Sequence, residues 1–122
     1  MTETQTPALA WFEIPVTDLM KAKAFYETVT GMTLTEQQMG PNTTWLFPMD
    51  ERKIGGHLYE GKPAATGVGP TLHLTIDGTV EEALERVAAA GGTAVSPVID
   101  IPAGRFAYCT DPDGNSLGIF QG

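Results

Sequence analysis

An internal repeat is the feature of this sequence that most constrains its fold. Residues 12–16 read Phe-Glu-Ile-Pro-Val and precede a helical stretch that ends at Gly31, whereas residues 72–76 read Leu-His-Leu-Thr-Ile and precede one that ends at Gly91. The two copies are offset by 60 residues at both landmarks. A repeat of this kind restricts the chain to folds in which one structural unit occurs twice.

The first copy predicts a strand followed by an amphipathic helix. In residues 12–16 every second side chain is apolar, which is the period of a strand with one buried face. Asp18 suits the N-cap of the following helix and Gly31 its end. Four side chains of that helix have the spacing of one helical face: Ala22, Phe25, Tyr26 and Val29. We therefore expect the helix to cover the apolar face of the strand.

The second copy predicts the same pair of elements. Apolar and polar side chains alternate again in residues 72–76, and Thr79 with Glu82 has the spacing of a capping box. Gly91 and Gly92 end the predicted helix. Its apolar positions are Val80, Leu84 and Val87.

Three short strand candidates follow each predicted helix, so each half is expected to form a βαβββ module. The candidates are Met32 to Glu36, Trp45 to Met49 and Ile54 to Tyr59, then Thr93 to Val95, Arg105 to Thr110 and Ser116 to Phe120. The predicted fold class is α+β, with a curved mixed sheet around a cleft. Its 122 residues form one domain, with module one at about residues 8–61, a linker at 62–69 and module two at about 70–121.

The segments between these elements are expected to be structural. Residues 111–114, Asp-Pro-Asp-Gly, favour a tight turn between the last two strands rather than a catalytic role. The Gly- and Pro-rich stretch 61–70 is interpreted only as a connection between the modules.

Net charge and the absence of targeting signals limit the binding partners and the location that we expect for this protein. Seven basic and fifteen acidic residues give a net charge of -8, which disfavours nucleic acid and anionic membranes. No apolar run approaches the roughly 20 residues that span a bilayer, and the first residues lack a signal-peptide pattern. The lone Cys109 lies in an apolar strand and is expected to be buried and inert. A cytoplasmic location is predicted.

Three segments carry a likeness to a known family. They are WFEIPVTDLMKAKAFYETVTGM, its repeated pattern at residues 72–92, and the closing TDPDGNSLGIF. Together they resemble the glyoxalase, bleomycin resistance protein and dioxygenase superfamily, also called the vicinal oxygen chelate superfamily. The resemblance covers nearly the whole chain and implies the two-module fold, but a scaffold shared by unrelated activities does not specify the chemistry.

The resemblance also implies four positions for ligands of a catalytic metal. In this sequence the first-strand positions are Trp11 and Thr71, one final-strand position is Gly118, and the other lies near Gly56 or Leu58. None of these side chains offers the imidazole, thiolate or carboxylate that divalent metals require. We therefore expect no bound metal and no cofactor, which argues against lactoylglutathione lyase chemistry.

Strand alternation selects a polar pair for the cleft. Glu13 shares a face with Trp11, and His73 shares a face with Thr71, in each case away from the helices. If the two first strands lie side by side, Glu13 and His73 enter one concavity as a catalytic acid and base. The alternative interpretation is that they only satisfy each other's hydrogen bonds.

Aromatic residues are expected to wall this cleft. Phe106 and Tyr108 share a face of one strand, Phe120 lies on the next, and Trp11 completes the set. His57 is a further candidate contact whose strand register the sequence leaves open. An alternative hypothesis joins Glu13, His57 and His73 in a two-histidine, one-carboxylate metal site.

Two functional hypotheses follow. In the first, the chain is a homodimeric binding protein whose aromatic, metal-free cleft sequesters an antibiotic or metabolite. In the second, it is a metal-independent lyase or isomerase that uses Glu13 and His73 as acid and base. The sequence does not identify the ligand.

Overall fold

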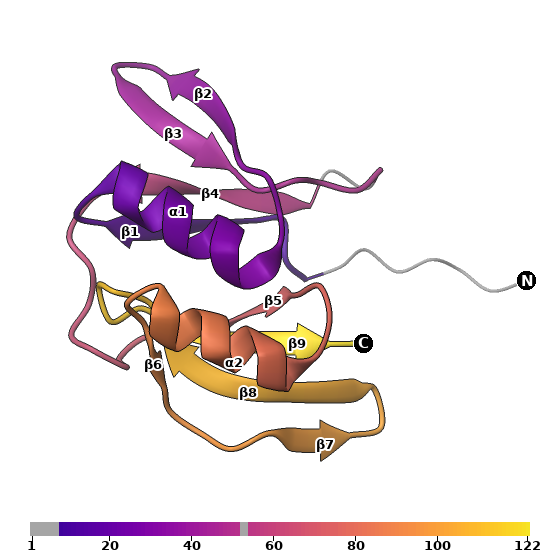
Figure 1. The fold of residues 1–122 in the computed structure, drawn as a ribbon. Coiled ribbons are helices and arrows are strands. Elements are labelled where there is room, and N and C mark those ends of the chain that lie inside the picture. The colour runs from indigo at the N-terminus through magenta and orange to yellow at the C-terminus, as the bar shows by residue number, and fades with distance from the viewer. Residues whose placement is uncertain (1–7, 52–53) are drawn as a thin grey trace, which may run out of the picture.

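The structure is a computed structural model that describes residues 8–51 and 54–122. It contains two mixed β-sheets and two helices (Figure 1). The first half comprises β1 (Trp11–Val16), α1 (Leu19–Thr30), β2 (Thr35–Met39), β3 (Asn42–Leu46) and β4 (Gly55–Glu60). The second half comprises β5 (Leu72–Thr75), α2 (Val80–Ala89), β6 (Thr93–Ala94), β7 (Ile99–Ile101), β8 (Gly104–Thr110) and β9 (Ser116–Gln121). The predicted α+β class is confirmed.

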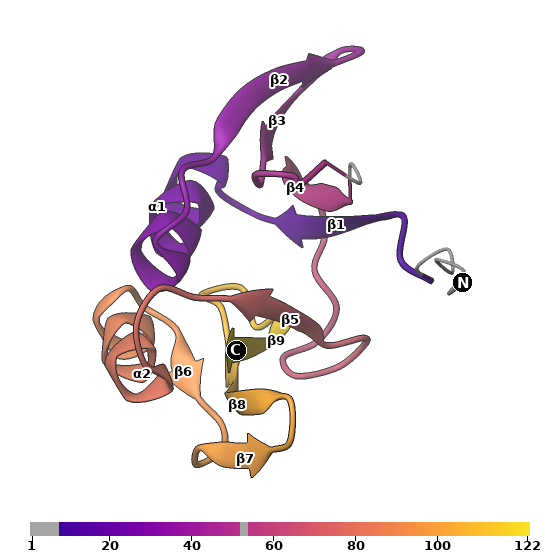
Figure 2. The same cartoon turned by 90° about the vertical axis from the view of Figure 1, so that its right-hand side faces the viewer.

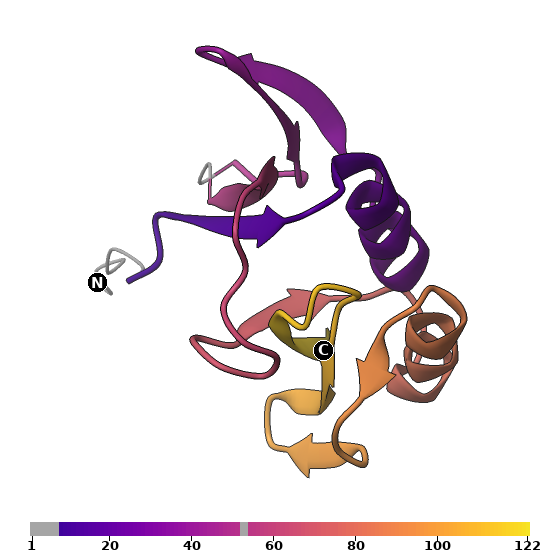
Figure 3. The same ribbon diagram turned by 90° about the vertical axis from the view of Figure 1, so that its left-hand side faces the viewer.

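Each half forms its own sheet with the same strand pairing. The first sheet has the order β1-β4-β3-β2, and the second has the order β5-β9-β8-β6 with β7 beside β8. In both sheets the first strand of the half pairs in parallel with its last strand. Figures 2 and 3 show α1 and α2 together on one side of the molecule. Within the described residues, no helix is long and apolar enough to cross a bilayer.

The helix boundaries follow the predicted caps. The Asp18 side chain accepts a hydrogen bond from the backbone N–H of Lys21, and Gly31 ends α1 with a φ of 80°, a conformation that glycine adopts without strain. Thr79 and Glu82 form the predicted capping box at the start of α2. Local sequence chemistry therefore defines where both helices begin.

Two strand predictions were displaced, and one strand was missed. The strands expected at 32–36 and 45–49 lie instead at 35–39 and 42–46, joined by a tight turn at Gly40. Most of β2 is exposed on both faces, so it lacks the alternation that reveals a half-buried strand. The second half also adds β7, a three-residue strand that pairs only with β8. This strand makes the second module larger than the predicted βαβββ unit.

One hydrophobic core runs through both halves. Ile14 and Val16 of β1 belong to the same buried cluster as Leu74 of β5 and Leu117 of β9. The helices contribute Phe25 and other apolar side chains to this cluster. Ile14 and Leu74 thus lie on the sheet faces that contact the shared core. The alternate residues on those strands face away from it.

A polar clamp joins the two halves at the turn of residues 111–115, which we call the clamp turn. The Asp113 carboxylate accepts hydrogen bonds from the backbone N–H and the hydroxyl of Thr17. The Asn115 side-chain amide donates to the carbonyl oxygen of Pro15 at 2.9 Å. Both contacts tie module two to the end of β1.

Asp111 is the buried centre of the clamp turn, with 3% of its surface exposed. Its carboxylate accepts hydrogen bonds from the Tyr26 hydroxyl at 2.6 Å, from the backbone N–H groups of Asp113 and Asn115, and from the Asn115 amide. Burial, followed by the charge of Asp111, raises the pKa of Tyr26 well above its usual value. The donors around Asp111 allow a carboxylate to stay buried.

Replacing Tyr26 with Phe is expected to lower the free energy of unfolding by about 1–3 kcal/mol, because Asp111 loses one donor while remaining buried. Urea denaturation at pH 7 measures the change. The control is Tyr108→Phe, since Tyr108 is 36% exposed, and its effect should stay within about 0.5 kcal/mol. Equal losses of unfolding free energy in the two variants would contradict a stabilising role for the Tyr26–Asp111 hydrogen bond.

Candidate functional site

Three predicted site residues form a row of polar contacts on the first sheet. The Trp11 indole N–H donates to Nδ1 of His57 at 2.9 Å. Nε2 of His57 lies 3.2 Å from Oε1 of Glu13. His57 is only 5% exposed, whereas the Glu13 side chain is 62% exposed. The row therefore consists of the half-buried indole of Trp11, the buried imidazole of His57 and the accessible carboxylate of Glu13.

The hydrogen bond from Trp11 determines the tautomer of His57. An indole nitrogen can only donate, so Nδ1 of His57 must be the unprotonated nitrogen that accepts. The ring proton then lies on Nε2, which is 3.2 Å from Oε1 of Glu13. Both ring nitrogens are engaged within the protein.

The strand register narrows the fourth ligand position implied by the family resemblance to one residue. Glu13 pairs with His57 across β1 and β4, and His73 pairs with Gly118 across β5 and β9. His57 is thus the counterpart of Gly118, between the two residues that the sequence left open, Gly56 and Leu58. The imidazole of His57 is a side chain that can bind a metal ion, but the other three positions carry Trp11, Thr71 and Gly118. This set does not fit a divalent metal, because a single imidazole is its only suitable donor.

A second cluster, which we call the ring cluster, lies on the second sheet. His73, Phe106 and Tyr108 form edge-to-face pairs with ring centroids 5.1–5.7 Å apart. Phe120 pairs with Phe106 across β8 and β9, so the two residues share a sheet face. Gly118 lies beneath the His73 ring, and a Cβ atom there would overlap with it.

The structure does not pair Glu13 with His73. The strands β1 and β5 belong to separate sheets, in which each is an edge strand, so the expected side-by-side pairing is absent among the described strands. The partner of Glu13 is His57, and His73 contacts the rings of Phe106 and Tyr108. Within residues 8–51 and 54–122, no three acidic, histidine or cysteine side chains form a group that could hold a metal ion. The alternative site of Glu13, His57 and His73 is therefore not assembled.

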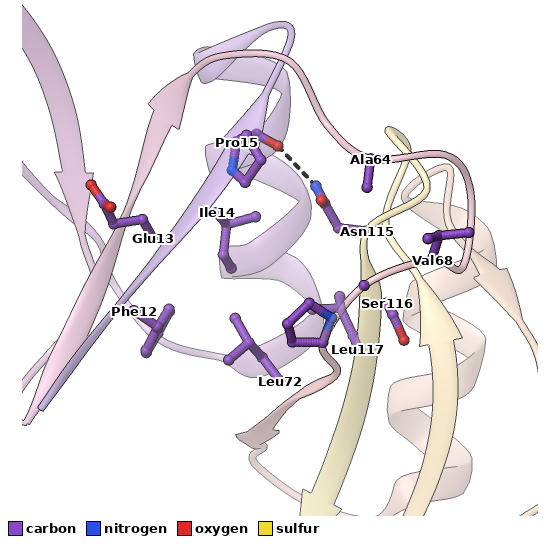
Figure 4. A pocket seen from close by; sticks show the side chains of 12 residues that line it. Phe12, Glu13, Ile14, Pro15, Ala64, Val68, Leu72, Asn115, Ser116 and Leu117 are labelled. Atoms are coloured by element: carbon purple, nitrogen blue, oxygen red, sulfur yellow. Dashed lines mark hydrogen bonds between the residues drawn. The ribbon is translucent and has the colours of Figure 1, made fainter. Parts of the chain in front are cut away.

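A cavity of about 300 Å³ lies at the seam between the two modules. Figure 4 shows Phe12 and Ile14 pointing from β1 toward Leu72 and Leu117, while Glu13 leaves the strand in another direction. The residues that line this seam cavity are Phe12, Glu13, Ile14, Pro15, Ala64, Val68, Gly69, Pro70, Leu72, Asn115, Ser116 and Leu117. Of the predicted contact residues only Glu13 belongs to this set, although Thr71 shares a hydrogen bond of 2.6 Å with the lining residue Ser116.

Sequence reasoning missed the part of the cavity that the linker builds. Ala64 and residues 68–70 line it, and the Gly67 N–H donates to the carbonyl oxygen of Gly114 in the clamp turn. The stretch is thus more than a connection. Its Gly and Pro content indicated a loop but carried no signal for packing against the clamp turn.

The lone thiol takes no part in this site. Cys109 is 1% exposed, and burial, with a smaller contribution from Asp111, raises its pKa to about 12. At neutral pH it is a protonated core side chain, as predicted.

Comparison with known proteins identifies the family. The sequence profile of the Glyoxalase/Bleomycin resistance protein/Dioxygenase superfamily matches residues 8–119. The chain belongs to this superfamily. It is 30% identical over 121 residues to the protein named "Putative glyoxylase CFP32" in Mycobacterium bovis and in Mycobacterium tuberculosis. The match covers 96% of this chain but 45% of those proteins, so the chain spans about half the length of these relatives.

Solved structures of superfamily members agree with the fold. A glyoxalase/bleomycin resistance protein from Streptomyces sp. CB03234 is 27% identical, with a TM-score of 0.68, over 93% of this chain and 100% of that protein. TnmS3, an antibiotic binding protein from the same source, is 25% identical with a TM-score of 0.67, and the match covers 98% of each chain. The predicted superfamily and its fold are therefore confirmed.

A double-mutant cycle tests the packing of His73 over Gly118. Gly118→Ala is expected to destabilise the protein by about 1–2 kcal/mol, because the new methyl group forces the His73 ring to move. In a His73→Ala background the same substitution should cost less than about 0.5 kcal/mol. Thermal unfolding of the four proteins measures the coupling, and an equal cost in both backgrounds would contradict the predicted overlap.

Proposed function

We propose that this superfamily member binds a small organic molecule whose apolar body occupies the seam cavity. The cavity carries the proposal: its volume of about 300 Å³ suits a small ligand, and its walls are mostly apolar with a few polar groups. The similarity to an antibiotic binding protein supports sequestration of an antibiotic or metabolite.

The polar contacts proposed for the ligand lie around the cavity. Glu13 belongs to the lining residues, and its carboxylate lies 3.2 Å from Nε2 of His57, whose Nδ1 accepts a hydrogen bond from Trp11. We infer that the rest of the predicted contact set extends the site along the open faces of the second sheet: Thr71, His73, Phe106, Tyr108 and Phe120. A cytoplasmic location belongs to the same proposal, since a single buried thiol suits a reducing compartment.

A metal-independent lyase or isomerase is the second candidate, and the accessible Glu13 carboxylate favours it. The sequence predicts Glu13 and His73 as the acid and base. The 3.2 Å contact between Nε2 of His57 and Oε1 of Glu13 supports a version in which Glu13 moves the proton and His57 orients the carboxylate. Loss of turnover with retained binding in a Glu13→Gln variant would select this candidate over simple sequestration.

Blocking the cavity tests the binding proposal. Isothermal titration calorimetry with 1-naphthylmethanol should give a Kd of about 1 mM or below, as expected for a probe of about twelve heavy atoms. Ala64→Trp places an indole in the exposed wall of the cavity and should weaken binding at least about tenfold. Ala88→Trp, on the exposed side of α2, is the matched control. No binding to the wild type, or equal binding to both variants, would refute the seam cavity as the site.

We further propose a homodimer that forms through the second sheet. Val95 and Ile101 expose apolar surface beside β6 and on β7, the strands at the edge of this sheet.

Light scattering coupled to size exclusion should report twice the chain mass of 13.0 kDa. Ile101→Asp is expected to shift the protein to monomer at micromolar concentration, because a charge would be buried in the interface. Met20→Asp on α1 is the control and should remain dimeric. A wild type that is monomeric at high concentration rules the dimer out.

A further inference from the structure

Trp11 and His57 stand at two of the positions that the family resemblance implies for metal ligands, and here their side chains bond to each other. The Trp11 indole N–H donates to Nδ1 of His57 at 2.9 Å. This hydrogen bond occupies the acceptor nitrogen of the His57 ring.

The same row of polar contacts presents a carboxylate to the ligand. Because Nδ1 of His57 accepts from Trp11, the ring proton lies on Nε2, and Nε2 is 3.2 Å from Oε1 of Glu13. The Glu13 side chain is 62% exposed and lines the seam cavity. An ionised carboxylate only accepts hydrogen bonds, so this corner offers a fixed negative acceptor.

We propose that the Glu13 carboxylate, positioned by His57 and through it by Trp11, makes the protein select ligands with an apolar body and an ammonium or other hydrogen-bond-donating head. The inference rests on the proposed function and names its ligand class. Among the twelve residues that line the cavity, Glu13 alone is ionisable, so no cation there offers to pair with an anionic head. The net charge of -8 acts in the same direction over longer distances.

Three probes with one apolar body and different heads test the selectivity. Calorimetric titration of 1-naphthylmethylamine, 1-naphthylmethanol and 1-naphthoate at pH 7 should give affinities in that order. The amine should bind at least about tenfold more tightly than the carboxylate, the scale of one charge-assisted hydrogen bond. Equal affinities, or tightest binding of the carboxylate, would overturn the inference while leaving the cavity-binding proposal intact. Binding of none of the three would overturn both.

A charge-matched pair of variants assigns the effect to Glu13. Glu13→Gln should reduce the preference for the amine over the carboxylate to less than about threefold. Glu36→Gln removes the same charge from an exposed position on β2 and should preserve the preference. If both variants lose it equally, net charge rather than the Glu13 carboxylate selects the head, and the inference fails.

Variants of His57 and Trp11 test the positioning role. Glutamine can accept from the indole N–H and donate to Glu13, so His57→Gln should retain the amine preference, whereas His57→Leu should lose it. Long-range ¹H–¹⁵N spectra should show the Nε2–H tautomer of His57 in the wild type, and Trp11→Phe should abolish that single tautomer. Circular dichroism checks the fold of each variant, and Trp11→Phe decides the question if His57→Leu does not fold. Unchanged selectivity and an unchanged tautomer in Trp11→Phe would contradict the positioning role.

Discussion

The hydrogen bond between Tyr26 and Asp111 is the interaction on which the geometry of this molecule depends. It joins the helix of the first module to the clamp turn of the second, and both partners are buried. The same turn holds Pro15 through Asn115 and Thr17 through Asp113. Because the seam cavity is bounded by β1 and by residues 115–117, the clamp fixes the spacing of its walls. Packing of apolar side chains alone is non-directional and does not set this spacing.

The sequence allowed the fold to be predicted where local chemistry decides the structure. Caps such as Asp18 and Gly31 act within a few residues, so α1 and α2 were located correctly. The strand at 35–39 was displaced because its exposure to solvent on both faces erases the alternation signal. Asp111 was interpreted as a turn residue only, since its burial depends on Tyr26, which lies 85 positions earlier.

The candidate site was predictable in its residue types but not in its pairing. Alternation correctly separated Glu13 from the helix-facing side chains of β1, and the repeat correctly related Glu13 to His73. The partner of Glu13 depended on the register of β4, which follows from pairing with β1 rather than from any local pattern. That register placed His57 beside Glu13 and left His73 among aromatic rings. Because β1 pairs with β4 and β5 pairs with β9, Glu13 and His73 lie in two different environments and do not form the acid–base pair that the sequence predicts.

The linker at residues 61–70 supplies part of the seam cavity wall that the two repeated modules do not. The two modules share one repeated pattern, whereas Ala64 and residues 68–70 belong to the segment between them and line the seam cavity. Side chains of the repeated strands must satisfy packing in their own sheets, but these loop residues lie outside both sheets. Under the proposed binding function, substitutions in the linker would therefore change ligand preference at little cost to either module's core, and specificity is expected to vary there first.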